Sequence, residues 1–114
     1  MATATVVKTK AVARATKAQR EAVLRVKRAQ RAAILLKQVS DPTRLRIILM
    51  LAEGERHVGA LCEVLDQNQP ATSHHLALLR HTGMIAARRQ GKNNFYALTE
   101  PGKRLASIVE DLIG

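Results

Sequence analysis

The spacing of apolar residues along this chain changes from a helical to an alternating period, and then back to a helical one. From Ala18 to about His81, apolar residues recur every three or four positions, as they do on one face of a helix. Residues 85–98 instead have the pattern of two short strands around residues 91–94, whose types tolerate left-handed turn geometry. Thr99 and Pro101 then start a new helix. The sequence therefore predicts a helical region, one β-hairpin and a final helix.

Four helices are expected before the hairpin. The first begins at about residue 18. The second begins at Pro42, directly behind Ser40 and Asp41 as capping residues, and is ended by Gly54. A short third helix lies within residues 57–66, and a fourth runs from a cap at Asn68 or Gln69 to about residue 81. Two helices joined by a tight turn, with a basic hairpin directly after them, form a winged helix-turn-helix pattern.

The fold class expected is therefore mainly α with a small β-hairpin. Residues 1–17 form a basic N-terminal arm, disordered or partly helical, and residues 18–114 form the winged helix-turn-helix domain. Each helix has an expected inward face, made of Leu45, Ile48, Leu49 and Ala52 in the second, Val58, Leu61, Cys62 and Leu65 in the third, Thr72, Leu76 and Leu79 in the fourth, and Leu105, Ile108, Val109 and Leu112 in the last. In the first helix, a narrow seam suits packing against another helix and comprises Ala22, Val26, Ala29, Ala33 and Leu36.

The net charge of +10 is concentrated at the N-terminus. Residues 1–40 contain ten bases against one acid, whereas residues 41–114 contain nine bases and eight acids. Such asymmetry indicates a polyanionic partner, either nucleic acid or an anionic membrane surface, and we favour nucleic acid. No apolar run is long enough to span a membrane, and no apolar block typical of a secretion signal is present. We therefore expect a cytoplasmic, nucleoid-associated protein.

The fourth helix carries a polar face suited to the major groove. Gln69, Ser73, His74 and Arg80 lie opposite the expected core positions and offer donors and acceptors for base edges or phosphates. Ser73 is short enough to let the helix backbone approach DNA closely. Polar outer faces are common on amphipathic helices, so this face is not specific by itself.

The clustered histidines argue against a metal or catalytic site. His74 and His75 point about 100° apart on a helix, and His81 lies about 10 Å further along, so they do not share an ion easily. No acid lies between Asp66 and Glu100 to orient a catalytic histidine. His75 is expected to be packed and hydrogen-bonded. We expect no catalytic residues, no metal and no cofactor.

Three motifs in order carry a family resemblance: SDPTRLRIILML, QPATSHHLALLRHTGMI and RRQGKNNFYAL. Together they resemble the ArsR/SmtB family of bacterial winged-helix repressors over about residues 32–112. The resemblance implies a homodimer formed through the first and last helices, which binds a pseudo-palindromic operator in double-stranded DNA and blocks transcription. By position it assigns Gln69, Ser73 and His74 to the major groove. Pro70 stands where many members have a contacting Ser. The wing at 85–98 would grip the flanking backbone through Arg88, with Lys92 and Asn93 at its tip.

The chain departs from the family's metal-sensing motifs. Where the thiolate site has cysteines and an acid, this chain has His57, Gly59 and Ala60, and the last helix contains no His. The usual metal sites are therefore expected to be absent, and the inducer is unknown. Cys62, the only cysteine, rules out an internal disulfide. It is expected to be a small buried hydrophobe, with a redox switch as the functional alternative.

The basic arm is an addition to the family pattern. Its Lys8, Lys10, Arg14 and Lys17 are expected to follow the DNA backbone or enter the minor groove. An architectural, histone-like protein with little sequence preference is the main alternative function. An enzyme using Cys62 and His57 is a weaker one, because those two side chains point to different sides.

Overall fold

The computed structural model describes Arg14 and residues 16–114. The chain divides into two units, Met1–Leu35 and Leu36–Gly114, which are considered separately. The first unit contains most of α2, a helix that runs from Lys17 to Val39. Within this first unit, every described side chain is exposed except that of Leu35, which is half-buried. No described helix is both long enough and apolar enough to cross a membrane.

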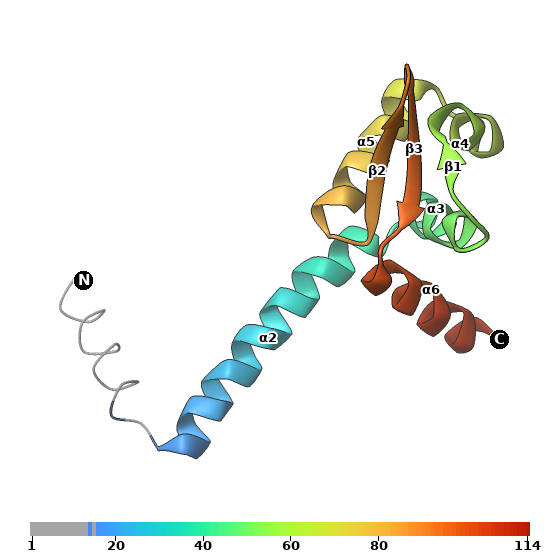
Figure 1. Ribbon diagram of the computed structural model, residues 1–114. Helices are drawn as coiled ribbons and strands as arrows, with labels where there is room; N and C mark the ends of the chain where they lie inside the picture. The colour runs from blue at the N-terminus through green and yellow to red at the C-terminus, as the bar shows by residue number, and fades with distance from the viewer. Residues whose placement is uncertain (1–13, 15) are drawn as a thin grey trace. The chain divides into compact units, whose positions relative to one another are not determined.

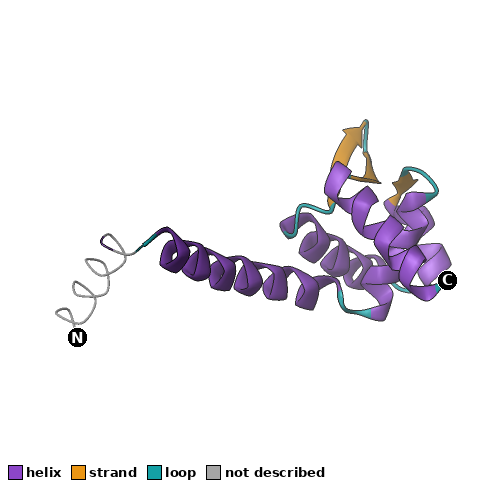
Figure 2. Ribbon diagram, turned by 90° about the horizontal axis from the view of Figure 1, so that it is seen from below, coloured by secondary structure: helices purple, strands orange, loops and turns teal. Residues whose placement is uncertain are grey.

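The second unit contains four complete helices and a small sheet (Figures 1 and 2). In chain order its elements are α3 (Pro42–Ala52), β1 (Arg56–His57), α4 (Val58–Leu65), α5 (Gln69–His81), β2 (Ile85–Gln90), β3 (Asn93–Leu98) and α6 (Glu100–Ile113), preceded by the last turn of α2. 

Counting α2, the described chain therefore has five helices, four of which lie wholly within the second unit. The predicted class, mainly α with a β-hairpin, is confirmed.

The sheet has three antiparallel strands in the order β1-β3-β2, so β3 is the central strand (Figure 1). The hairpin β2–β3 pairs in register from Ile85 with Leu98 to Gln90 with Asn93, and its turn contains Gly91 at a positive φ of 62°. The strand β1 was not predicted. Its two residues pair with Tyr96 and Phe95, a segment too short to show an alternating pattern in sequence.

The core lies where α3, α5 and the sheet meet. Its largest fully buried side chains are Ile47, Ile48, Leu61, Thr72, Leu76 and Leu79. The inward face predicted for α3 was partly wrong: Ile48 is buried, but Ala52 is exposed and Leu45 and Leu49 are only half-buried. Ile47 and Leu51 are buried instead. The helix is covered from more than one side, so a single apolar stripe did not predict its contacts.

The helix ends follow the predicted capping chemistry. Asp41 Oδ2 accepts a hydrogen bond from the Arg44 backbone N–H at 3.0 Å, and Asn68 Oδ1 accepts one from Ala71 at 2.8 Å. Thr99 caps α6 in the same way. Each cap satisfies one of the N–H groups that the first helical turn leaves without a partner. These caps fix where α3, α5 and α6 begin.

The last helix begins in close contact with the chain before the wing. A Cβ placed on Gly102 would lie 2.0 Å from the carbonyl oxygen of Met84, and only a glycine fits there without a shift of the backbone. The Thr99 N–H also donates to that carbonyl, at 3.0 Å. The start of α6 is thereby held at the base of the wing. The rest of its predicted inward face is less covered: Ile108 is 54% and Leu112 80% exposed.

Candidate nucleic-acid interface

The turn between α4 and α5 sets the direction of the candidate recognition helix. Asp66 ends α4 in the left-handed conformation, with a φ of 52°, and Asn68 caps α5 two residues later. The inner face of α5 is then buried through Thr72, Leu76 and Leu79, as the sequence predicted. This helix is therefore anchored along one face by apolar contacts, which leaves the other face for solvent or a partner.

Five of the residues expected to contact DNA lie on α5. Gln69, Pro70, His74 and Arg80 are exposed, and Ser73 is half-buried. His81, in the last turn, is also exposed. It lies seven residues after His74 and so shares its face, although this spacing is too long for the two rings to bind one metal ion. His81 is thus an additional candidate for contact with a partner.

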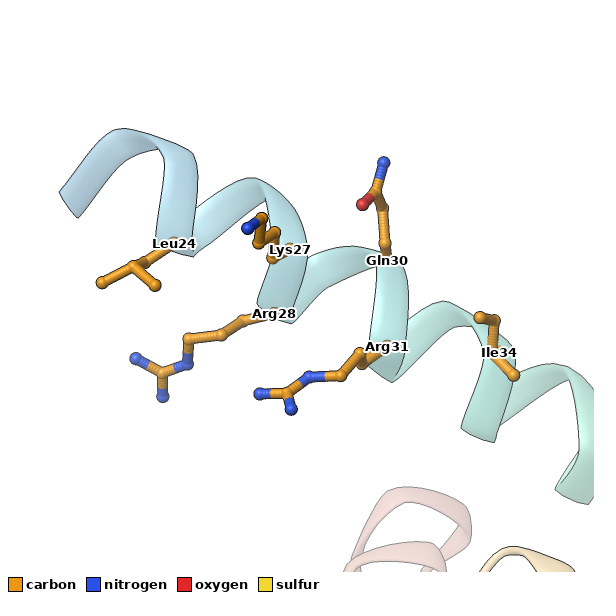
Figure 3. Close-up of a pocket in the computed structure, with 6 residues that line it drawn as sticks. All are labelled: Leu24, Lys27, Arg28, Gln30, Arg31 and Ile34. Atoms are coloured by element: carbon orange, nitrogen blue, oxygen red, sulfur yellow. The ribbon is translucent and has the colours of Figure 1, made fainter. Parts of the chain in front are cut away.

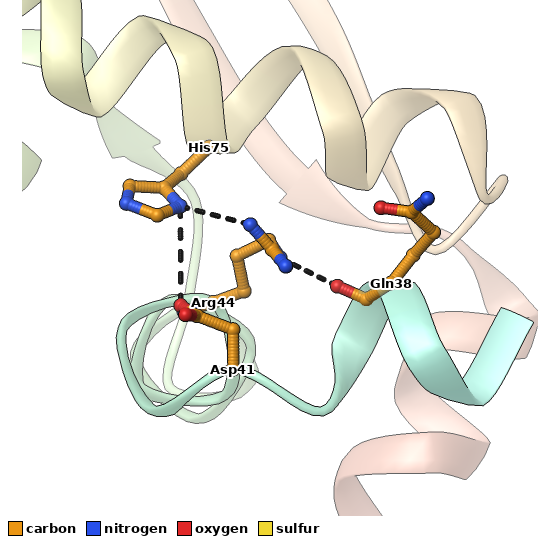
Figure 4. A network of polar contacts seen from close by, with 4 residues as sticks. All are labelled: Gln38, Asp41, Arg44 and His75. Atoms are coloured by element: carbon orange, nitrogen blue, oxygen red, sulfur yellow. Dashed lines mark hydrogen bonds and ion pairs between the residues drawn. The ribbon is translucent and has the colours of Figure 1, made fainter.

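His75 has a structural role, as predicted (Figure 4). Its Nδ1 lies 3.3 Å from Nη1 of Arg44 and 3.9 Å from Oδ2 of Asp41. Because the guanidinium only donates, Nδ1 is the acceptor in the neutral ring and Nε2 carries the proton. Arg44 Nε also donates to the Gln38 carbonyl. This network ties α5 to the start of α3 and to the last turn of α2.

The same network affects the ionisation of Asp41. The backbone N–H of Arg44 donates to its carboxylate, and this bond, reinforced by the charge of Arg44, holds the pKa of Asp41 below its ordinary value of 3.8. The carboxylate is therefore charged at neutral pH, where it serves as the cap of α3.

The wing is fastened to the loop before α4 by Arg88. Its guanidinium donates to Glu55 in a bidentate ion pair, hydrogen-bonds Gln90 Oε1 at 2.9 Å, and lies 5.0 Å from the ring centre of Phe95. The hydrogen bond from Arg88 lowers the pKa of Glu55, and Glu55 in turn raises the pKa of Arg88. Arg88, expected from the sequence to contact DNA, is thus engaged within the protein in this structure.

At the tip of the wing the two expected contact residues differ. Lys92 is exposed. Asn93 is also exposed, but its Oδ1 lies 3.1 Å from Nε2 of His57. The ring of His57 packs at a tilt against Phe95, with ring centres 5.5 Å apart. The region before α4 therefore holds the hairpin at two points, through Glu55 and through His57.

Comparison with known proteins identifies the family of this helix-turn-helix and wing. The sequence profile described as bacterial regulatory protein, arsR family, matches residues 41–87. An HTH-type transcriptional regulator of Methanocaldococcus jannaschii, MJ1325, is 38% identical over 80 residues, which cover 68% of this chain and 90% of that protein. The chain belongs to the ArsR family. This membership makes it a regulatory protein of winged helix-turn-helix type and not an enzyme.

Other ArsR-family relatives carry names that describe regulation. The arsenical resistance operon repressor of Escherichia coli is 52% identical over 66 residues, and the chain spans 56% of its length. Among solved structures, HlyU from Vibrio cholerae has a TM-score of 0.70 at 34% identity, with 75% of this chain and 95% of that chain covered. BigR from Xylella fastidiosa, described as a transcriptional repressor, has a TM-score of 0.69 at 38% identity, with 82% of this chain and 91% of that chain covered.

His57, which stands where the family resemblance places a thiolate ligand, is engaged within the protein. The Nδ1 atom of His57 accepts a hydrogen bond from the Gly59 N–H at 3.0 Å, which makes His57 the cap of α4. Both ring nitrogens are therefore occupied by protein partners. Within Arg14 and residues 16–114, no three His, Cys, Asp or Glu side chains are grouped so as to hold a metal ion. Cys62 is a free thiol and is half-buried, less covered than expected.

The arm residues are only partly within the described structure. Arg14 and Lys17 are exposed. Lys8 and Lys10 lie outside the described residues. The division into an arm of residues 1–17 and a domain of 18–114 stays a prediction.

Proposed function

We propose that this chain is a homodimeric, sequence-specific DNA-binding repressor of the ArsR/SmtB type. In this proposal α5 enters the major groove, where Gln69, Ser73 and His74 meet base edges and Arg80 a phosphate. The wing lies along the flanking backbone. The observation that carries the proposal is the division of α5 into a buried inner face and an exposed polar outer face, directly before a basic hairpin.

The dimer surface proposed is an apolar groove of about 290 Å³ in the second unit. It lies between the end of α2, α3 and α6, and it is lined by Leu36, Val39, Ser40, Leu45, Leu105, Ile108, Val109 and Leu112. Large side chains left this exposed on a monomer are typical of an interface. One solved ArsR-family neighbour, from Mycobacterium bovis, is described as a homodimeric winged helix-turn-helix domain, with a TM-score of 0.72 at 29% identity.

A two-fold dimer explains why the apolar face of α6 is left uncovered within a single chain. The predicted inward face of that helix faces the groove instead of a closed core, so a second copy would cover what the single chain leaves open. Such a dimer presents two copies of α5 and therefore favours an inverted repeat in DNA. The N-terminal arms, including Arg14 and Lys17, would add affinity that does not depend on sequence.

The direction of regulation is also part of the proposal. Several relatives are named as repressors, whereas the HlyU of Vibrio cholerae is named as a transcriptional activator. We favour repression because the arsenical resistance operon repressor is 52% identical over 66 residues, whereas the activator is 40% identical over 65. No metal inducer is assigned, since His57, Gly59 and Ala60 provide no free ligand set.

The experiment that tests this proposal is selection from a randomised DNA pool at physiological salt, followed by sequencing. We expect an inverted repeat, with preference over random DNA by roughly 10³-fold or more. A pool that stays random despite tight binding at low salt would instead support an architectural, histone-like protein. An enriched single half-site would contradict the dimer but not the reading of bases by α5.

A further inference from the structure

The first unit has a basic face of which the proposed arm includes only Lys17, and α5 and the wing include none. Successive residues of a helix are turned by about 100°, so Lys17, Lys27, Arg28 and Arg31 of α2 fall within an arc of about 100°. All four side chains are exposed. No ion pair joins Lys27, Arg28 or Arg31 to a carboxylate within the described residues. Their positive charge therefore faces solvent.

Figure 3 shows how some of these side chains are arranged. Arg28 and Arg31 project side by side from the same side of the helix. They help to line a shallow hollow of about 440 Å³ together with Lys27, Gln30 and the aliphatic Leu24 and Ile34. The stems of long basic side chains can lie on such aliphatic groups while their charged ends reach outward.

We propose that this face of α2, formed by Lys17, Lys27, Arg28 and Arg31, binds the phosphate backbone of double-stranded DNA as a contact surface of its own. The inference rests on the proposed DNA-binding function and adds a second surface to it. From Lys17 to Arg31 the helix rises about 21 Å, at about 1.5 Å per residue. That length is comparable with about two thirds of a turn of B-DNA.

Charge favours DNA as the occupant of this face. Glu21 is the only acid in α2, and it stands at the edge of the arc. Basic residues spaced three or four positions apart on a helix lie about 5–6 Å from one another along one face. Their long side chains can therefore reach separate phosphates. Because backbone phosphates are present in every sequence, this surface strengthens binding without selecting a site.

The distribution of apolar residues argues against a membrane surface. A helix that lies in a membrane interface has bulky apolar residues opposite its basic face. Opposite this face, α2 has mainly small side chains, namely Ala18, Ala22, Val26, Ala29 and Ala33. Leu24 and Ile34 lie beside the bases instead, so their insertion would carry charged groups toward the apolar layer.

Two double variants of equal composition test the proposal. Lys27→Gln with Arg31→Gln removes one lysine and one arginine from the basic face. Arg25→Gln with Lys37→Gln removes the same two residue types from positions outside the arc. All four positions are exposed and glutamine is a good helix former, so circular dichroism should report unchanged helix content.

The readout is the slope of log affinity against log salt on a duplex that carries the selected sequence. Each phosphate contact contributes about 0.9 to this slope, so the on-face variant should lose nearly two units per protomer. The off-face variant should keep the wild-type slope. Sequence preference should be the same in all three proteins.

Other outcomes would overturn this inference, the proposed function or both. Equal losses in both variants would show diffuse attraction by net charge, and no loss in either would remove the surface. Wild-type binding to phosphatidylserine vesicles that is abolished by the on-face variant, with DNA binding intact, would assign the face to membranes. A wild-type protein with no sequence preference, but with the expected difference in slopes, would contradict the proposed repressor and leave this surface standing. Absence of any DNA binding would contradict both.

Discussion

The guanidinium of Arg88 in the wing is held by the carboxylate of Glu55, which lies in the loop before α4. The whole helix-turn-helix, α4 and α5, lies between the two residues in sequence, so the ion pair joins the segments that flank that motif. The ion pair also engages Arg88, a basic residue that the sequence analysis expected to contact the DNA backbone. In the proposed complex with DNA, Glu55 and the phosphates would compete for the guanidinium of Arg88, and this competition can be measured.

We expect Glu55→Gln to strengthen DNA binding at low salt by several-fold. The substitution releases Arg88 to bind a phosphate, and the slope of log affinity against log salt should steepen by about 0.9 per protomer. Adding Arg88→Gln should cancel the gain. Glu53→Gln is the matched control, because Glu53 is a nearby exposed carboxylate that pairs with Arg56 at 2.9 Å. An equal gain in that control would assign the effect to net charge.

Replacing Ser73 and His74 together by alanine should abolish site preference and leave low-salt binding largely intact. These side chains are proposed to read base edges, whereas most of the affinity at low salt comes from phosphates. The measurement is the ratio of affinities for selected and random duplexes. Arg104→Ala with Ser107→Ala, on the exposed side of α6, is the control. Loss of all binding, or an unchanged ratio, would contradict the assignment of α5.

Leu112→Gln should weaken the dimer, seen as a lower mass in sedimentation at micromolar concentration. Leu112 is 80% exposed in the single chain and lines the apolar groove. The substitution would therefore remove an apolar contact that the proposed dimer buries. Ile113→Gln is a close control: Ile113 is the next residue, is 74% exposed, and does not line the groove. The same shift in both variants would argue for a different interface.

Asp41→Ala should lower the free energy of unfolding by about 1 kcal/mol, because α3 loses its cap. Asp41→Asn retains an accepting oxygen and should cost less. The pH dependence separates charge from capping. Folding lowers the pKa of Asp41 below its ordinary value of 3.8. Its charge therefore contributes stability that is present above pH 3.8 and is lost as the pH falls through the folded-state pKa.

Urea unfolding at neutral and acid pH measures both effects of Asp41. Wild type should lose more stability than Asp41→Asn between neutral pH and about pH 3, since only wild type has this carboxylate to protonate. Asp111→Asn, at an exposed carboxylate near the C-terminus, is the control and should follow wild type. Parallel pH profiles for wild type and Asp41→Asn would contradict the role of the charge.

Gly102→Ala should destabilise the protein by about 1–3 kcal/mol, although alanine is the better helix former. The added Cβ would meet the Met84 carbonyl oxygen at 2.0 Å, so the wing base and α6 must move apart. Ser107→Ala, at an exposed position of the same helix, should be neutral or slightly stabilising. A stabilised Gly102→Ala variant would show that the contact relaxes without cost.

Local signals in the sequence predicted the helices and the hairpin of this fold better than they predicted the contacts between these elements. The caps at Asp41, Asn68 and Thr99 are short-range features, because each side chain binds a backbone group three residues away. The buried face of α5 also followed from helical spacing. In contrast, β1 and the burial of Ile47 depend on segments that are distant in sequence. The spacing of apolar residues within one segment does not predict such contacts.

The same distinction applies to the candidate site. The exposure of Gln69 and His74 could be predicted from the face on which they lie. The partners of Arg88 and Asn93 could not, since Glu55 and His57 are more than thirty residues away in sequence. Pairing of distant charged and polar groups is decided by the tertiary fold, and it changed the interpretation of two of the wing residues.

The open edge of the sheet has a consequence for solubility. One side of β3 is partly closed by β1, which leaves β2 as the long strand with a free edge. Unpaired strand edges invite strand addition by neighbouring molecules and promote aggregation, and charged side chains oppose this. The edge strand β2 carries Arg88 and Arg89. The basic character of the wing therefore also protects a concentrated protein from assembling edge to edge, whether or not DNA is bound.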